Sequence, residues 1–130
     1  MNKKIVIAVI VLVVLAVLGF YMFGKSTGNV VSGEDVKTFV LTGDHLRFYM
    51  NGVENPDLVV KQGDRVRIEL TNTEGYHDWV LAEFGAQTEA VRAVNSTSVE
   101  FVADKKGTFE YYCSIGKHRA NGMKGKFIVE

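Results

Sequence analysis

Three side chains that bind soft metal ions are evenly spaced near the C-terminal end of the chain. The segment CSIGKHRANGM carries a thiol at Cys113, an imidazole at His118 and a thioether at Met123. Copper favours this mixture of soft sulfur and imidazole, and two His with one Cys and a weak axial Met form an electron-transfer arrangement. A second imidazole must come from elsewhere, and His77, in GYHDW, is the candidate. The four residues together predict a site for one copper ion.

The chain has a single cysteine, so no internal disulfide can form. In an exported protein a lone thiol is either a liability or a ligand. Three of the four candidate ligands also have a structural interpretation: Cys113 as a small buried residue, His77 as a structural histidine after a turn, and Met123 as a core side chain. We expect His45, on the polar face of its strand, at the surface.

The N-terminal part of the chain has the pattern of a membrane anchor. Ile5 to Phe23 gives nineteen consecutive residues without a charge. At about 1.5 Å per residue such a helix is roughly 28 Å long, close to the ~30 Å hydrocarbon core of a bilayer. Lys3 and Lys4 precede it and favour a cytoplasmic N-terminus. A signal peptide would be shorter and would end in a small-residue cleavage site, and a core helix would have a polar face. We therefore predict a single-pass anchor over residues 1–24, with the copper site on the extracytoplasmic side of the cell membrane.

Residues 25–35 are rich in Gly, Ser and Thr, which predicts a flexible linker. From Glu34 onward the chain has twelve basic and fifteen acidic residues, a net charge of −3. A nucleic-acid binder would instead have a clustered basic excess, so this class of partner is excluded. The remaining residues 36–130 have the length of one ordinary domain, for which we expect a monomer.

From Val36 onward, apolar and polar residues alternate as in half-buried strands. The alternation is clearest in four stretches: residues 46–50, 65–70, 98–101 and 108–111. Turn signals separate them, and no stretch after residue 35 has a helical apolar stripe, although residues 86–93 fit either a helical turn or an extended edge. About seven or eight short strands at this spacing predict an all-β fold, a Greek-key sandwich of two antiparallel sheets.

The phase of these strands predicts where two of the ligands lie. Cys113 shares its parity with Tyr111, and His77 shares its parity with Trp79. Alternate residues of a strand lie on the same face, so both ligands should start from the apolar face at one end of the sandwich. Tyr111 and Trp79 should be core residues rather than electron-relay groups. The loop 114–122 has two glycines and no proline, so it can turn sharply between ligands.

These segments resemble the cupredoxin family of blue copper proteins, which includes plastocyanin and azurin. The likeness covers about residues 36–130 and is carried by VVKQGDRVRIELTN, GYHDW and FEYYCSIGKHRANGMKGKFIV. Residue 78 is Asp where many relatives have Asn, and the ligand spacing differs from that of the best-known members. The resemblance implies one-electron transfer by copper that cycles between Cu(I) and Cu(II). It also implies a set of four copper ligands: His77, Cys113, His118 and Met123.

Taken together with the predicted anchor, the resemblance implies an electron carrier, not an enzyme, that is held at the membrane and serves redox partner proteins outside the cytoplasmic membrane. The edge of His118 would be the entry or exit point for the electron. Four basic residues flank the ligand loop and could steer an acidic docking patch of a partner to the copper end: Lys117, Arg119, Lys124 and Lys126. A red-copper-type enzyme on the same fold and a copper-handling or sensing module stay open as alternatives. A multicopper oxidase domain and a dinuclear copper centre are excluded, because the chain has three His and one Cys.

Overall fold

The computed structural model describes residues 2, 3, 7 and 35–130. The predicted membrane helix (5–23) and linker (25–35) lie outside the described residues, apart from residues 7 and 35. Within the described residues, no helix is both long enough and apolar enough to cross a membrane.

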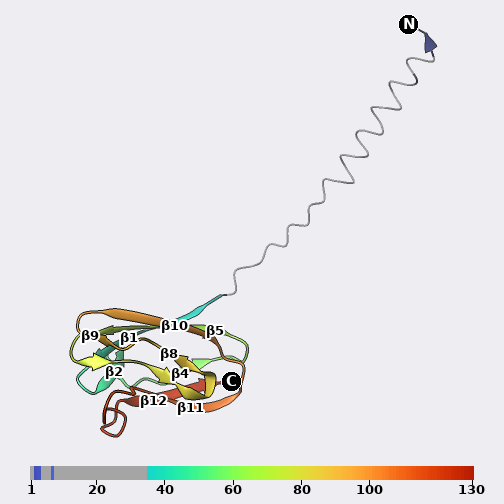
Figure 1. The fold of residues 1–130 in the computed structure, drawn as a ribbon. Helices are drawn as coiled ribbons and strands as arrows, with labels where there is room; N and C mark the ends of the chain where they lie inside the picture. The colour runs from blue at the N-terminus through green and yellow to red at the C-terminus, as the bar shows by residue number, and fades with distance from the viewer. Residues whose placement is uncertain (1, 4–6, 8–34) are drawn as a thin grey trace. The chain divides into compact units, whose positions relative to one another are not determined.

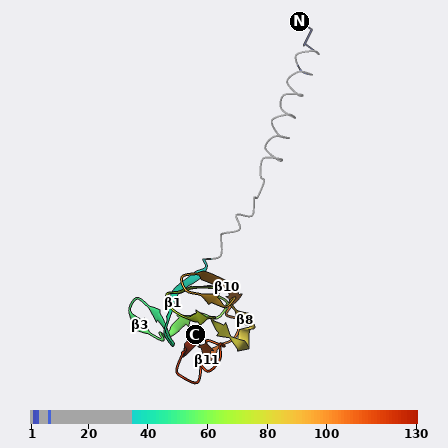
Figure 2. The same cartoon turned by 60° about the vertical axis from the view of Figure 1, so that its left-hand side comes forward.

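The strands form two five-stranded sheets with a shared core (Figure 1 and Figure 2). The first sheet has the order β10–β5–β1–β2–β3. Its strands are β1 (Lys37–Asp44), β2 (Arg47–Met50), β3 (Val53–Glu54), β5 (Arg65–Asn72) and β10 (Ser96–Val102). The second sheet has the order β4–β12–β11–β7–β8. Its strands are β4 (Leu58–Val60), β7 (Val80–Leu81), β8 (Ala86–Gln87), β11 (Gly107–Tyr112) and β12 (Lys124–Val129). A separate pair consists of β6 (Tyr76–His77) and β9 (Val91–Arg92).

The all-β, two-sheet sandwich predicted from the alternation is confirmed, but its sheets are mixed rather than antiparallel. β1 pairs with β5 in parallel, and β4 pairs with β12 in parallel. These parallel neighbours arise because the chain leaves the first sheet after β3, adds β4 to the second sheet and returns to the first with β5. Residues 35–130 contain twelve strands rather than seven or eight, since five of them have only two residues.

The core between the sheets is apolar and aromatic. Val66, Ile68 and Leu70 are fully buried in β5, and the residues between them are partly exposed, as the alternation predicts. The rings of Trp79 and Tyr111 stack with their centroids 5.7 Å apart, and both residues are fully buried. They are therefore core residues, and their packing fixes β7 and β11, the strands that run next to the site.

Residues 86–93 form extended edges and not a helical turn. β8 pairs with β7, and β9 pairs with β6. Within residues 35–130 the one helical element is a 3₁₀ turn, η1 (Ala82–Phe84), which Gly85 ends with a φ of 61°. This short turn lets the chain fold back so that β9 lies against the strand that carries His77.

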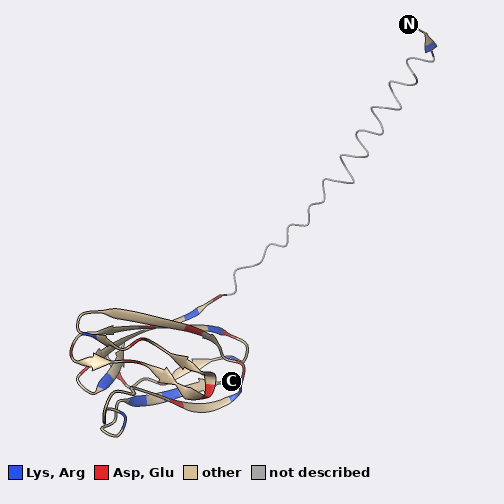
Figure 3. Ribbon diagram, in the orientation of Figure 1, with Lys and Arg blue, Asp and Glu red and all other residues tan. Residues whose placement is uncertain are grey.

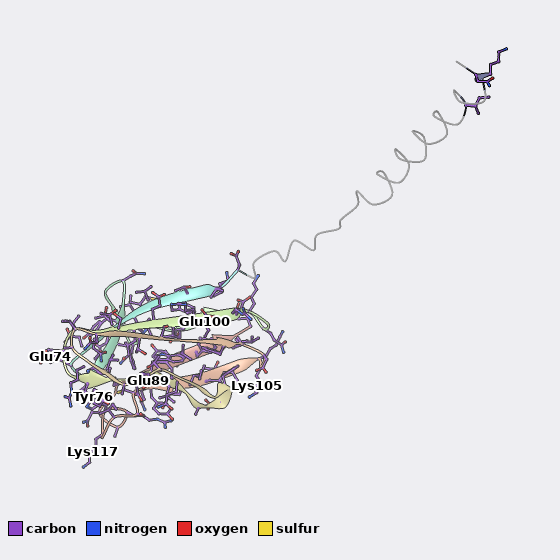
Figure 4. The ribbon with its side chains drawn as sticks, turned by 45° about the horizontal axis from the view of Figure 1, so that its top comes forward. Glu74, Tyr76, Glu89, Glu100, Lys105 and Lys117 are labelled. Carbon is purple, nitrogen blue, oxygen red and sulfur yellow. The ribbon has the colours of Figure 1, made fainter. Side chains whose placement is uncertain are left out.

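The segments that carry the predicted ligands meet at one end of the sandwich. His77 ends β6, Cys113 directly follows β11, and the loop 114–123 leads into β12. In Figure 1 this loop, coloured dark red, projects beyond β11 and β12. Figure 4 places Glu74, Tyr76 and Lys117 at this end and Lys105 at the opposite end.

Candidate metal centre

Three of the predicted ligands converge on one point. The Nδ1 atoms of His77 and His118 are 3.1 Å apart. The Sγ atom of Cys113 lies 3.8 Å from Nδ1 of His77 and 3.5 Å from Nδ1 of His118. Cys113 is fully buried, His77 is 1% exposed and His118 is partly exposed. The donor atoms of His77 and Cys113, which are 36 positions apart in the chain, thus lie together, as their strand parity predicted. His118, 41 positions from His77, joins them from the ligand loop.

These donor atoms fit one copper ion. Metal bonds of about 2.0 Å to imidazole nitrogen and about 2.3 Å to thiolate, as in zinc sites, leave neighbouring donors roughly 3–4 Å apart. The measured separations, 3.1, 3.5 and 3.8 Å, lie in that range. No carboxylate belongs to this group of ligand atoms in the part of the chain that the structure describes. One thiolate with two imidazoles suits copper and does not suit the hard cations magnesium and calcium.

Met123 is tied to the other ligands through its backbone. Its N–H donates to the carbonyl of His118 over 3.0 Å, and its carbonyl accepts from the N–H of Cys113 over 3.1 Å. The side chain is fully buried and belongs to the same core cluster as Cys113. A thioether held in this position can serve as the weak axial ligand of a trigonal His₂Cys site.

The ligand loop turns sharply where the sequence places its glycines. Gly116 has a φ of 49° and Gly122 a φ of 98°, in the left-handed region that glycine enters without steric cost. Between them the N–H of His118 donates to the carbonyl of Ile115 over 3.0 Å. The two predicted turns therefore present His118 and Met123 to the buried sulfur of Cys113.

A model of copper-binding proteins of the plastocyanin/azurin family matches residues 23–130 of the chain. The chain therefore belongs to this cupredoxin family. Its one type 1 copper site is formed by His77, Cys113, His118 and Met123.

Individual relatives include both large enzymes and small proteins. The chain is 34% identical over 99 residues to a nitrous-oxide reductase of Stutzerimonas stutzeri, a match that covers 68% of this chain and 15% of the reductase. It is 30% identical over 93 residues to a copper-containing nitrite reductase of Alcaligenes xylosoxydans xylosoxydans, covering 62% and 28% of the two chains. The fold is that of auracyanin A, a "blue" copper protein from Chloroflexus aurantiacus, with a TM-score of 0.60, 21% identity and coverage of 73% of this chain and 99% of auracyanin A. The chain thus spans only a small part of the two reductases.

The environment of the cupredoxin site favours neutral ligands in the absence of a metal. Burial raises the pKa of the Cys113 thiol to about 11; the N–H groups of Asp78 and Ile115 oppose this shift, and the Asp78 carboxylate adds to it. Burial also lowers the pKa of His77, and the nearby His118 lowers it further. At neutral pH, copper must therefore displace the proton of Cys113, whereas His77 is already neutral.

Asn72, the last residue of β5, holds the first ligand in place. Its side chain is fully buried, and its Nδ2 donates to the carbonyl of His77 over 3.3 Å and also to the carbonyl of Val91. A Cβ on Gly75 would lie 2.8 Å from Nε2 of His77, so only glycine fits beside the imidazole. A side-chain amide that ends a buried strand just before a candidate ligand is the signal that could have identified Asn72.

Asp78 is the second supporting residue, and its carboxylate bonds to the segment that carries Cys113. The side chain is 1% exposed although its parity is opposite to that of His77. Its Oδ1 accepts from the N–H of Ser114 over 2.7 Å, and its Oδ2 accepts from the hydroxyl of Ser114. Asp78 therefore links the His77 segment to the Cys113 segment. The backbone N–H groups of Asp78 and Ile115 also lie at hydrogen-bonding positions near the Cys113 sulfur.

The remaining candidates do not belong to the copper site. His45 is exposed, as predicted, with Nδ1 2.6 Å from Asp44 and Nε2 3.3 Å from Glu74. Ligand atoms of these three residues lie within 4.8 Å of one another, but the group is largely exposed and these contacts account for its geometry.

The four basic residues that flank the ligand loop are not equivalent. Nε of Arg119 lies 2.7 Å from a Glu110 oxygen, and Nζ of Lys124 lies 3.8 Å from the other oxygen of that carboxylate. The Arg119 guanidinium also covers the ring of Tyr112 at 3.8 Å from the centroid. Lys117 is exposed, and no carboxylate of the described residues forms a salt bridge with it. Figure 3 shows the basic positions in blue on the loop and on β12.

Proposed function

We propose that this cupredoxin carries single electrons between redox partner proteins. The observation that supports this best is the unequal burial of its ligands. Cys113 and Met123 are fully buried, whereas His118 is partly exposed. A hollow of about 670 Å³ reaches His77 and His118 and is also lined by Leu46 and Ile115. An electron can therefore cross at the edge of His118 while the sulfur ligands stay shielded from water.

The chain's own residues limit how far the copper ligands move when the ion changes its oxidation state. Bound copper supplies the one-electron step between Cu(I) and Cu(II). The backbone bonds from Cys113 to Met123 and from Met123 to His118 hold the loop. Asn72 holds the backbone of His77 from the other side. Thiolate, thioether and imidazole together suit both oxidation states, so a fixed set of these ligands favours fast electron transfer.

The expected partner carries an acidic patch beside its own redox group. Lys117 supports this, because it is exposed next to His118 and has no salt bridge to the described carboxylates. Opposite charges on two surfaces speed their encounter more than they tighten the complex. We expect the protein to meet this partner as a monomer.

We further propose that the uncharged run of residues 5–23 anchors the chain in the cell membrane, with the copper site on the extracytoplasmic side. The support is the length of the run and the two lysines that precede it. The test is to fractionate cells that express the full chain or a variant without residues 1–24. The full chain should sediment with membranes, and recovery of the full chain in the soluble fraction would contradict the anchor.

The copper chemistry is tested by the optical and electron spin resonance spectra of the full copper-loaded protein, with Cys113→Ser as the control. The intact protein should have an intense blue thiolate-to-copper band and should pass reversibly through one one-electron step. The Cys113→Ser variant should lose the band and keep the β-sheet circular dichroism spectrum. A retained band would assign the colour to another ligand.

The same measurements separate the two alternative functions. A red, tetragonal spectrum would favour an enzyme with an open coordination position. Rapid loss of copper to a chelator from an otherwise blue site would favour a copper-handling module. A blue site that exchanges electrons quickly and copper slowly is the result expected for a carrier.

A further inference from the structure

Asp78 is a buried carboxylate that only accepts hydrogen bonds. Its oxygens accept from the N–H of Ser114, from the hydroxyl of Ser114 and, over 3.2 Å, from Nε2 of Gln87. An ionised carboxylate has no donor, so three donors around one carboxyl group are the pattern of the charged form. The residue is 1% exposed, so water can solvate this charge only weakly.

No cation neutralises this charge within the described residues. The salt bridges of residues 35–130 join other acidic groups, and none of them includes Asp78. Buried charges in proteins are normally paired, so an unpaired one next to a metal site needs an explanation. The charge lies close to the ligands, because Asp78 directly follows His77 in the chain and accepts hydrogen bonds from Ser114, the residue after Cys113.

We propose that Asp78 is a fixed negative charge that sets the reduction potential of the copper site, and that Ser114 determines how strongly the copper feels it. The inference rests on the copper site and does not depend on which partners exchange electrons with it. It concerns a buried residue that is not among the four copper ligands.

The direction of the effect follows from charge balance. Cu(II) with one thiolate has a net charge of +1, and Cu(I) with one thiolate is neutral. A nearby carboxylate therefore stabilises the oxidised form more than the reduced form and lowers the reduction potential. Attraction between charges is weakly screened away from water, so a buried carboxylate acts more strongly than an exposed one. The Ser114 hydroxyl offsets part of the charge, because its O–H dipole points at the carboxylate.

The substitution Asp78→Asn tests the charge while it keeps the hydrogen bonds. The amide oxygen can still accept from the N–H of Ser114, and the amide N–H₂ can donate to a rotated Ser114 hydroxyl. We expect the ratio of reduced to oxidised copper at a fixed applied potential to rise about tenfold, which for a one-electron couple is about 59 mV. Ser114→Ala keeps the carboxylate and removes the hydroxyl, so its potential should move in the opposite direction.

Glu74→Gln is the matched control, because it removes the same charge from an exposed side chain three residues before His77. Its potential should change much less than that of Asp78→Asn. Potentials are measured by voltammetry of the full copper-loaded chains, and the metal-free variants are unfolded with urea in parallel. Asp78→Asn should unfold at the same or a higher urea concentration than the parent, because it no longer buries an unpaired charge.

Three results would overturn the proposal. They are an unchanged potential in Asp78→Asn, shifts of the same sign in Asp78→Asn and Ser114→Ala, or an equal shift in Glu74→Gln. Shifts of the same sign would mean that Asp78 acts only as a structural link. A parent protein without a blue band or a reversible redox step would instead refute the proposed electron transfer, and it would do so before any variant is compared.

Discussion

The backbone N–H of Cys113 donates a 3.1 Å hydrogen bond to the carbonyl of Met123, so the loop that carries three of the four copper ligands is closed at its two ends. Within the loop, the backbone N–H of Met123 donates a 3.0 Å hydrogen bond to the carbonyl of His118. None of these bonds involves a ligand side chain. Backbone hydrogen bonds therefore determine the conformation of the loop. Bound copper adds stability to a conformation that these bonds already favour.

Removal of copper should lower the stability of the protein but not change its secondary structure. The far-ultraviolet circular dichroism spectrum should be the same with and without copper, since the sheets and the closed loop do not depend on the metal. The unfolding free energy should rise with free copper, by about 2.7 kcal/mol at a concentration one hundred times the dissociation constant. Urea unfolding at several copper concentrations measures this. Loss of the sheet signal without copper would contradict a loop that the backbone holds.

Replacement of the axial ligand should change the potential more than the colour. Met123→Leu keeps the buried volume nearly constant, so the cost in stability should be below about 1.5 kcal/mol. The thiolate band should remain, because Cys113 and both imidazoles are unchanged. The reduction potential should rise, since the oxidised ion loses an electron-donating sulfur. Met50→Leu, in β2, is the matched control and should leave the potential unchanged. Equal shifts in the two variants would argue against Met123 as a ligand.

The copper ligands and the two-sheet architecture could be predicted from the sequence because both depend on local patterns. Alternation placed Cys113 on the same face as Tyr111, and ligand chemistry limited the metal to copper. The parallel pairing of β1 with β5 could not be predicted, since register between distant strands depends on the route of the chain between the sheets. The contacts of Asn72 and Asp78 were missed for a similar reason: their partners Val91 and Ser114 lie 19 and 36 residues away in sequence.

Copper uptake should release a proton and should become tighter as the pH rises. The Cys113 pKa is raised from 9.0 to about 11, so the thiol is protonated at neutral pH and must lose its proton to bind the metal. The apparent affinity should rise about tenfold per pH unit between pH 7 and pH 9, as one proton is released per ion. Titration of weakly buffered protein with copper, while the pH is recorded, counts the protons. Cys113→Ser should release none from this position.

The same shift predicts how the metal-free protein responds to alkali. A group whose pKa is raised by folding contributes stability below its unfolded value and loses that contribution as the pH rises through its folded value. For Cys113 the contribution is present below pH 9.0 and is lost toward about pH 11. Urea unfolding of the parent and of Cys113→Ala should therefore diverge above pH 9.0. Parallel pH dependence of the two proteins would mean that the buried thiol is not the cause.

A methyl group at Gly125 should destabilise the strand that follows the ligand loop. A Cβ there would overlap the hydroxyl and the ring of Tyr111, and that hydroxyl donates a 2.6 Å hydrogen bond to the carbonyl of Pro56. Gly125→Ala should cost about 1–3 kcal/mol, as overpacking of a core usually does. Gly52→Ala is the control, because its Cβ meets no atom within 4 Å and only its φ of 79° is unfavourable. If Gly125→Ala costs no more than Gly52→Ala in urea unfolding, the close packing against Tyr111 is wrong.

The charge of Lys117 should control electron exchange at the copper end of the molecule. Lys117 follows the end of β11, while Lys105 precedes its start, and Figure 4 shows the two at opposite ends. Lys117→Glu should slow oxidation by an anionic iron–cyanide complex severalfold at low salt and should speed oxidation by a cationic cobalt complex. Both effects should fade at high ionic strength, where the screening length falls to about 3 Å. The growth of the blue band after the reduced protein is mixed with each oxidant, followed by stopped flow, gives these rates. Lys105→Glu makes the same change in net charge but should leave them nearly unchanged, because it lies away from the edge of His118. Equal responses of the two variants would show that only the net charge matters, and that electrons do not cross at the His118 end.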